Sequence, residues 1–132
     1  MSPERCPCGS GAPYDECCGP ALAGSPAATP EALMRSRYTA FVRGDGDYLA
    51  ATWHPGTRPD DTAPDAELRW TGLDILDAPP PSPKRGVVEF IARYRSAGNA
   101  GQLHERSRFV FQSGRWWYLD GATPGDGSMA GS

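Results

Sequence analysis

No window of this 132-residue sequence approaches the roughly 20 consecutive apolar residues that a helix needs to cross a bilayer. The first residues, MSPERCPCGSG, also lack the apolar run of about seven to fifteen residues found in a secretion signal. We therefore expect a cytoplasmic protein with no membrane span.

Positive charge is also scarce. The sequence has 13 Lys and Arg against 16 Asp and Glu, which give a formal net charge of −3 and a pI near 5.3. This balance excludes an overall attraction for nucleic acid or anionic lipid, so any such contact, for example with the ribosome, needs a local patch. The aromatic residues, 4 Trp, 5 Tyr and 4 Phe, are enough to build a core and argue against a wholly disordered chain.

Cysteine is absent after residue 18, and all four cysteines lie in the segment CPCGSGAPYDECCG. In a reducing compartment thiols stay free, so closely spaced cysteines indicate metal or redox chemistry. The Cys-x-x-Cys motif of redox proteins is absent, and a disulfide between the adjacent Cys17 and Cys18 would be strained. The spacing therefore predicts a metal site.

Four thiolates suit a closed, tetrahedral, structural site. Zinc is the expected ion, and iron stays an alternative because a four-sulfur site accepts either. Gly9 and Gly11 allow the backbone to fold back around the sulfurs, and APYDECC predicts one helical turn that delivers the second ligand pair. The predicted ligands are Cys6, Cys8, Cys17 and Cys18.

The residues CPCGSG, Tyr14 and CCG resemble the SEC-C motif, the small metal-binding module at the end of the bacterial translocation motor SecA. In SecA this module binds a chaperone partner, phospholipid and the ribosome. The resemblance implies that a protein partner binds this chain through the metal finger, in the translocation, chaperone or ribosome machinery.

A linker and a helix are predicted next. The segment Ala21–Pro30 is rich in small residues and indicates a flexible linker. Thr29 is a good N-cap for a helix that runs to about Arg43. On this helix Arg37 falls within the apolar stripe, whereas Arg35 falls on the far side and is expected to be solvated.

The rest of the chain predicts one short helix and four strands. GDYLAATW fits the helix, and the strands are expected over residues 67–77, 86–96, 102–112 and 115–120. DAPPPSPK and AGNAG join the first three strands, and Ser113 with Gly114 makes a tight hairpin to the fourth. These elements predict an antiparallel meander.

Helices followed by an antiparallel meander predict an α+β fold, in which a curved sheet wraps around the first helix to form a cone. The expected organisation has three parts. They are a small metal finger of four cysteines with its linker over residues 1–25, the cone-shaped α+β domain over 26–122, and a disordered tail over 123–132.

The segments TPEALMRSRYTAF, YLAATWHPGTRP, GVVEFIARY, LHERSRF and RWWYLDG are similar to the domain of the bacterial YchJ family that has a nuclear-transport-factor-two-like, or cystatin-like, fold. Together with the finger, this resemblance spans the chain up to about Gly121. Several relatives carry a further cysteine cluster at the C-terminus, which this sequence lacks.

Folds of this kind enclose a pocket between helix and sheet. Alternation along the third strand places Glu105 on the same inner face as the phenylalanines, so we expect it to pair with Arg37 across the helix–sheet interface. Ser107 is expected to complete this network, and Glu89 is the reserve partner. The candidate residues of the pocket are Arg37, Glu105, His54, Trp70, Ser107, Tyr118 and Glu89.

Two functions fit these features. The first is a zinc-binding adaptor that presents its finger to a protein partner. The second is a small-molecule-binding protein or enzyme that uses the pocket, with His54 as a candidate proton carrier. No nucleophile beside a base and no phosphate-cradling glycine loop is found, so the pattern leans away from an enzyme without deciding the question. The sequence leaves the oligomeric state and the identity of the partner open.

Overall fold

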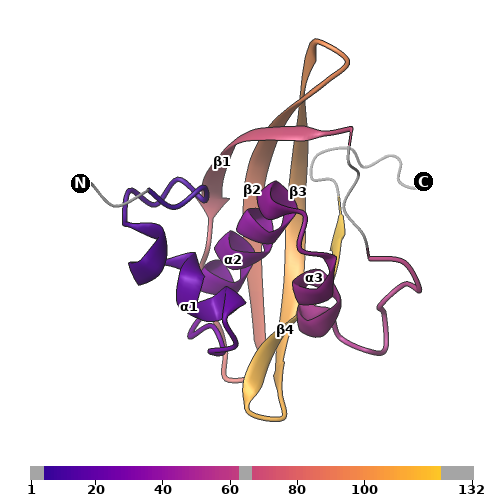
Figure 1. Ribbon diagram of the computed structural model, residues 1–132. Coiled ribbons are helices and arrows are strands. Elements are labelled where there is room, and N and C mark those ends of the chain that lie inside the picture. Colours follow the sequence, from indigo (N-terminus) through magenta and orange to yellow (C-terminus); the bar gives the residue numbers. More distant parts are fainter. Residues whose placement is uncertain (1–4, 63–66, 123–132) are drawn as a thin grey trace.

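The computed structural model describes residues 5–62 and 67–122 (Figure 1). Its helices are η1 (Tyr14–Glu16, a 3-10 helix), α1 (Cys18–Leu22), α2 (Pro30–Arg43) and α3 (Gly46–Thr52). Its strands are β1 (Arg69–Asp77), β2 (Arg85–Ser96), β3 (Asn99–Gln112) and β4 (Arg115–Ala122). This is the α+β class predicted from the sequence. The predicted tail, residues 123–132, lies outside the described residues.

Local signals set both ends of α2. The Thr29 hydroxyl accepts a hydrogen bond of 3.0 Å from the Ala32 N–H, and Pro30 occupies the first helical position. Gly44 ends the helix in the left-handed conformation, with φ 72°. The predicted helix is confirmed. Of the helices in the described part of the chain, none is long and apolar enough to cross a membrane.

The short helix α3 is also confirmed. The Asp45 carboxylate caps it by accepting a hydrogen bond of 3.0 Å from the Tyr48 N–H. The Tyr48 hydroxyl in turn lies 2.6 Å from the hydroxyl of Ser36, a buried residue of α2. This contact joins the two helices.

The four strands form an antiparallel meander in the order β1-β2-β3-β4. Ser113 and Gly114, with φ 55° and 82°, make the predicted tight turn between β3 and β4. The connection between β2 and β3 is shorter than the predicted AGNAG loop. Ala97 and Gly98 alone form it, with φ 52° and 84°, and β3 already begins at Asn99.

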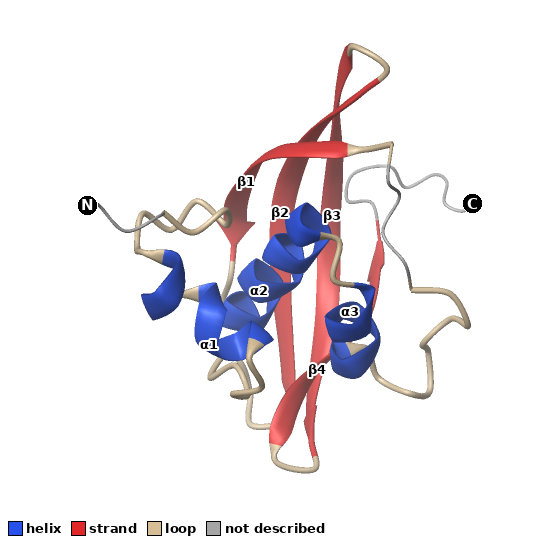
Figure 2. Cartoon of the chain, in the orientation of Figure 1, coloured by secondary structure: helices blue, strands red, loops and turns tan. Residues whose placement is uncertain are grey.

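The core lies between α2 and the face of the sheet that this helix crosses (Figure 2). Alternate residues of β2, namely Val88, Phe90 and Ala92, are buried there together with Phe109 of β3. Phe109 thus lies on the inner face that the alternation along the third predicted strand indicates.

The N-terminal finger packs onto the same core. Three of the four cysteines belong to the buried cluster that contains Leu33 and Met34 of α2. The helix α1 extends to Leu22, so the predicted linker from Ala21 is too long and its irregular part begins only after this helix. The division of the chain at residue 25 stays a prediction.

Gly86 of β2 lies against the start of α2. A methyl group added there would lie 2.4 Å from Cγ and 3.1 Å from Cβ of Pro30, and the proline ring cannot rotate away. We therefore expect Gly86→Ala to lower the free energy of unfolding by about 1–3 kcal/mol, measured by urea denaturation. Pro30→Ala in the same chain should recover part of this loss. A double variant without any recovery would contradict the contact.

Candidate metal centre

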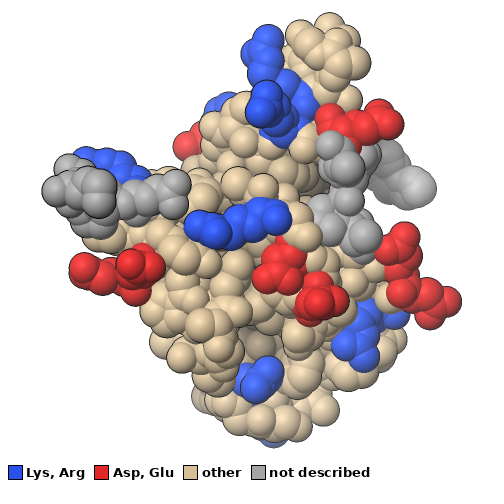
Figure 3. Space-filling model, in the orientation of Figure 1, with Lys and Arg blue, Asp and Glu red and all other residues tan. Residues whose placement is uncertain are grey.

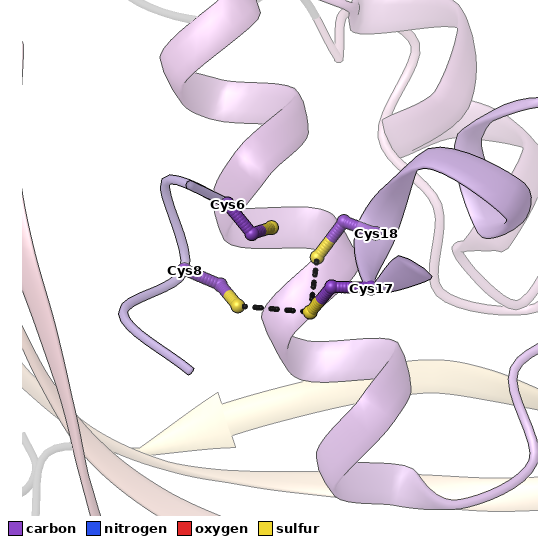
Figure 4. A group of neighbouring side chains, drawn as sticks. All are labelled: Cys6, Cys8, Cys17 and Cys18. Carbon is purple, nitrogen blue, oxygen red and sulfur yellow. Dashed lines mark hydrogen bonds between the residues drawn. The ribbon is translucent and has the colours of Figure 1, made fainter. Parts of the chain in front are cut away.

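The four cysteine sulfurs converge on one point (Figure 4). Cys6 and Cys8 come from the N-terminal loop, and Cys17 and Cys18 from the junction of η1 and α1. All four Sγ atoms lie within 4.8 Å of one another, with 3.5 Å between Cys8 and Cys17 and 4.0 Å between Cys17 and Cys18. We call this group the cysteine cluster.

These distances fit a metal ion. Four sulfurs at about 2.3 Å from a tetrahedrally coordinated zinc ion lie about 3.8 Å from one another. The Sγ–Sγ distances within the cysteine cluster, 3.5 Å and 4.0 Å for two pairs and at most 4.8 Å, lie on both sides of this value. A cation can therefore be bound without moving the backbone far. With all four positions taken by sulfur, no open position would remain for a substrate, and the ion would have a structural role.

The backbone explains why the two cysteine pairs meet. The Cys6 N–H donates to the Ala12 carbonyl at 2.9 Å, which closes a loop in which Gly9 and Gly11 take φ 81° and 87°. This left-handed conformation is the role predicted for the two glycines. At the second pair, Cys17 has φ −128° and ψ −99°, which separates η1 from α1 and lets adjacent side chains point the same way.

The cysteine cluster is largely shielded from water. Cys8 is 0% exposed, Cys18 2% and Cys6 4%, whereas Cys17 is half-buried. All four cysteines are free of disulfide bonds. Ionising several neighbouring buried thiols costs free energy, because the thiolates lose hydration and repel one another. A bound cation would offset this cost.

The pKa values of the thiols shift in opposite directions. Hydrogen bonding to Cys18, and then to Ser10, lowers the pKa of Cys8 to about 4. Burial raises the pKa of Cys17, and the hydrogen bond to Cys8 together with burial raises the pKa of Cys18. One thiolate is thus stabilised by neighbours that keep their protons. A bound cation would favour the ionised form of all four.

Polar residues around the cysteine cluster include three that the sequence did not single out as neighbours of the sulfurs. Arg35 donates from Nη1 to the Cys8 carbonyl at 3.0 Å, so the prediction that Arg35 is solvated is wrong. The Thr39 hydroxyl lies 3.7 Å from the sulfur of Cys6, and the Ser10 hydroxyl lies close to that of Cys17 at 3.1 Å. A signal was present, since Arg35 and Thr39 are four residues apart on one helix face.

Arg37 is buried in the α+β part, 3% exposed, but without the predicted ion pair to Glu105. Its Nη1 donates to the Leu49 carbonyl at 2.9 Å and to the Thr52 hydroxyl at 2.7 Å. Its guanidinium lies 4.3 Å from the centre of the Tyr118 ring. Burial lowers the pKa of Arg37 to about 10, which still leaves it charged at neutral pH. A carbonyl, a hydroxyl and two aromatic rings thus surround the guanidinium of Arg37 in place of the expected carboxylate.

Glu105, Ser107 and Tyr118 form the network that surrounds Arg37 on the sheet side. The carboxylate of Glu105 accepts hydrogen bonds from the hydroxyls of Ser107 at 2.7 Å and Tyr118 at 3.2 Å. Burial, and then the nearby charge of Glu105, raises the pKa of Tyr118. Ser107 thus joins Glu105 as predicted. Tyr118 links this pair to Arg37, because its hydroxyl donates to Glu105 and its ring lies against the guanidinium.

The remaining pocket candidates lie elsewhere. Glu89 is on the opposite face of the sheet, where it accepts from His104 at 2.7 Å and Arg106 at 2.9 Å, so it is no reserve partner of Arg37. His54 lies after α3, where its Nδ1 accepts from the Gly56 N–H at 3.0 Å and its Nε2 lies 3.0 Å from Oε1 of Gln112. Trp70 packs against Tyr38, Phe41 and Tyr94.

A cleft of about 330 Å³ lies beside the Arg37 group, between the connection after α1, the helix α3 and the start of β4. Thr52 lines this cleft, but Arg37 does not. The predicted pocket residues therefore occupy four separate places, and only Arg37, Glu105, Ser107 and Tyr118 form one group.

Comparison with known proteins agrees with this architecture. Residues 29–121 match the family described as "YchJ, middle NTF2-like domain", and residues 3–20 match the SEC-C motif. The chain belongs to the YchJ-like family. The first match covers α2, α3 and the whole sheet, and the second covers the cysteine cluster.

YchJ-like relatives match the chain over nearly its full length. A UPF0225 protein of Streptomyces coelicolor is 53% identical over 124 residues, which cover 92% of this chain and 97% of the relative. A UPF0225 protein of Bordetella parapertussis is 48% identical over 124 residues, which cover 91% and 93%.

Two solved structures are similar to this member of the YchJ-like family. The solution structure of a SEC-C motif containing protein from Rhodopseudomonas palustris has a TM-score of 0.81 and 43% identity, and the match covers 89% of this chain and 97% of that one. The crystal structure of a SEC-C motif containing protein from Psychrobacter arcticus has a TM-score of 0.70 and 28% identity, with 87% and 80% covered. Both resemblances confirm the predicted family and fold.

Proposed function

We propose that this chain is a zinc-dependent protein-interaction module. Zinc bound by Cys6, Cys8, Cys17 and Cys18 would fold the finger, and the exposed surface of the finger would bind a protein partner. The observation that carries the proposal is the convergence of four sulfurs within 4.8 Å. The SEC-C match adds that the same cysteine pattern occurs in an interaction module, and it favours a partner in the translocation, chaperone or ribosome machinery of the cytoplasm.

Zinc is favoured over iron because the site is closed and its ligands need only a soft, tetrahedral, redox-inert ion. Elemental analysis of anaerobically purified protein distinguishes the two. We expect about one equivalent of zinc per chain. Visible absorbance from a four-sulfur iron centre would assign iron instead.

An interaction role is favoured over catalysis because a closed metal site offers no coordination position to a substrate. The finger exposes Asp15 and Glu16 beside its second cysteine pair. On the face shown in Figure 3, acidic and basic groups are mixed, and the described residues form no continuous basic surface there. This pattern favours a protein partner over nucleic acid or an anionic membrane.

Affinity capture from cytosolic extract tests the proposal. We expect the zinc-loaded chain to retain a specific partner, and Cys17→Ser with Cys18→Ser to lose it, because the finger no longer folds. Glu16→Lys should weaken capture about tenfold while zinc content stays at one equivalent, since it changes only the exposed charge of the finger.

The matched control is Asp60→Lys, which makes the same charge change at an exposed residue in the loop after α3. It should leave capture unchanged. The proposal fails if the cysteine variant and the zinc-loaded parent retain the same partners, or if the two lysine variants weaken capture equally. A partner that passes these tests should then bind the purified chain directly.

A further inference from the structure

One face of α2 carries a polar stripe that points toward the finger. Glu31, Arg35 and Thr39 recur every four residues, which places them in a row along the helix. Glu31 accepts a hydrogen bond of 3.0 Å from Nε of Arg35, and Arg35 continues to the Cys8 carbonyl. Thr39 is 0% exposed and faces the sulfur of Cys6. This face is distinct from the side of α2 that packs on the sheet.

The charge of a loaded cysteine cluster needs compensation. Four thiolates around a divalent cation retain two negative charges, and three of the four sulfurs belong to buried residues. Nη1 of Arg35 lies 3.9 Å from the sulfur of Cys8, in addition to its hydrogen bond to the carbonyl of the same residue. This contact places a cationic side chain beside a cysteine sulfur.

Hydroxyl donors complete the surroundings of the sulfurs. The Thr39 hydroxyl lies 3.7 Å from Cys6, and the Ser10 hydroxyl lies 3.1 Å from Cys17. Hydrogen bonds to thiolates draw off negative charge and fix the direction of each ligand. Ser10 belongs to the finger itself, but Arg35 and Thr39 belong to the helix that packs on the sheet.

We infer that the metal site includes Arg35 and Thr39 of α2, so that one cation both folds the finger and holds it on the α+β part of the chain. Arg35 balances the negative charge of the loaded cluster, and Thr39 donates to the Cys6 thiolate. Both are positioning residues that do not touch the ion. The inference depends on the proposed metal binding and adds that the finger retains its ion poorly without this helix.

The affinity of the full chain for Zn²⁺ tests the role of Arg35. We expect Arg35→Met to raise the dissociation constant about 10–100-fold, measured by competition with a chromophoric chelator. Arg35→Lys should lie between parent and Met, because it keeps the charge but loses the planar fork. Thr39→Val, which removes only a hydroxyl, should raise the constant about tenfold.

Glu31→Gln is the matched control. It removes the carboxylate that holds Nε of Arg35 but leaves the contact of Nη1 with Cys8. Its dissociation constant should stay within about threefold of the parent, since surface pairs of this kind contribute little. If Glu31→Gln weakens binding as much as Arg35→Met, the effect belongs to the helix surface and the inference is wrong.

Urea denaturation separates a role toward the metal from simple packing. If Arg35 acts on the loaded site, the gain in stability on adding zinc should be smaller in Arg35→Met than in the parent. If Arg35 only packs, loaded and zinc-free forms lose the same stability, which overturns the inference. A parent chain that binds no zinc would refute the proposed function, whereas equal affinities of parent and Arg35→Met would refute this inference alone.

Discussion

Cys8→Ser should abolish zinc binding and lower the free energy of unfolding by about 4 kcal/mol when free zinc exceeds the dissociation constant of the parent about 1,000-fold. Cys8 is 0% exposed and lies 3.5 Å from the sulfur of Cys17, so a hydroxyl at this position removes a ligand from the centre of the cluster. Because the finger packs on the core around Leu33 and Met34, the loss should appear in the unfolding of the whole chain. Urea denaturation followed by tryptophan fluorescence measures it.

A chelator provides the control for this prediction. It should bring the parent down to about the stability of Cys8→Ser and should leave Cys8→Ser itself unchanged, because both treatments remove the same interaction. If the losses from chelator and substitution add up, the sulfur of Cys8 acts in packing and not in metal binding. A parent whose stability does not respond to the chelator would also contradict the prediction.

The features predicted well from the sequence depend on neighbouring residues. The N-cap at Thr29, the alternation that buries Phe109 of β3, and the spacing of the four cysteines all act over short stretches. Each gave the correct element or cluster. The connection between β2 and β3 was predicted too long, because a tight turn that begins with a non-glycine residue of positive φ, here Ala97, leaves little trace in the sequence.

The contacts predicted incorrectly depend on what lies across an interface. Placing Arg35 on the far side of α2 was sound geometry, but that side is covered by the finger, and periodicity along one helix does not show which segment covers it. For Arg37 the burial was correct and the partner was not. A long side chain can reach a neighbouring helix instead of the sheet. Here Arg37 of α2 reaches the carbonyl of Leu49 in the last turn of α3.

That position explains why Arg37 can remain charged without a carboxylate in contact. The last carbonyls of a helix lack partners within the helix and carry partial negative charge. Arg37 donates to one of them and to the hydroxyl of Thr52, and it lies against the faces of Trp53 and Tyr118. The arginine thereby joins α2, α3 and β4, which is a structural role.

Arg37→Ala should therefore lower the free energy of unfolding by about 3–4 kcal/mol. The substitution leaves a cavity between the rings of Trp53 and Tyr118 and removes the closer of the two donors to the Leu49 carbonyl. Zinc content should stay at one equivalent, because the described contacts of Arg37 do not involve the cysteine cluster. Urea denaturation of the zinc-loaded chain provides the measurement.

Arg37→Met distinguishes a structural arginine from one kept for a ligand. Methionine retains most of the apolar stem but removes the charge. The variant loses the hydrogen bonds of Arg37, and this loss is partly offset because a guanidinium no longer has to be buried. If Arg37 supports the fold, the variant should be less stable than the parent by about 1 kcal/mol. An arginine retained for binding in a pocket would instead be a cost to stability. Arg37→Met more stable than the parent by over about 1 kcal/mol would favour the small-molecule function and contradict the structural role argued from these contacts.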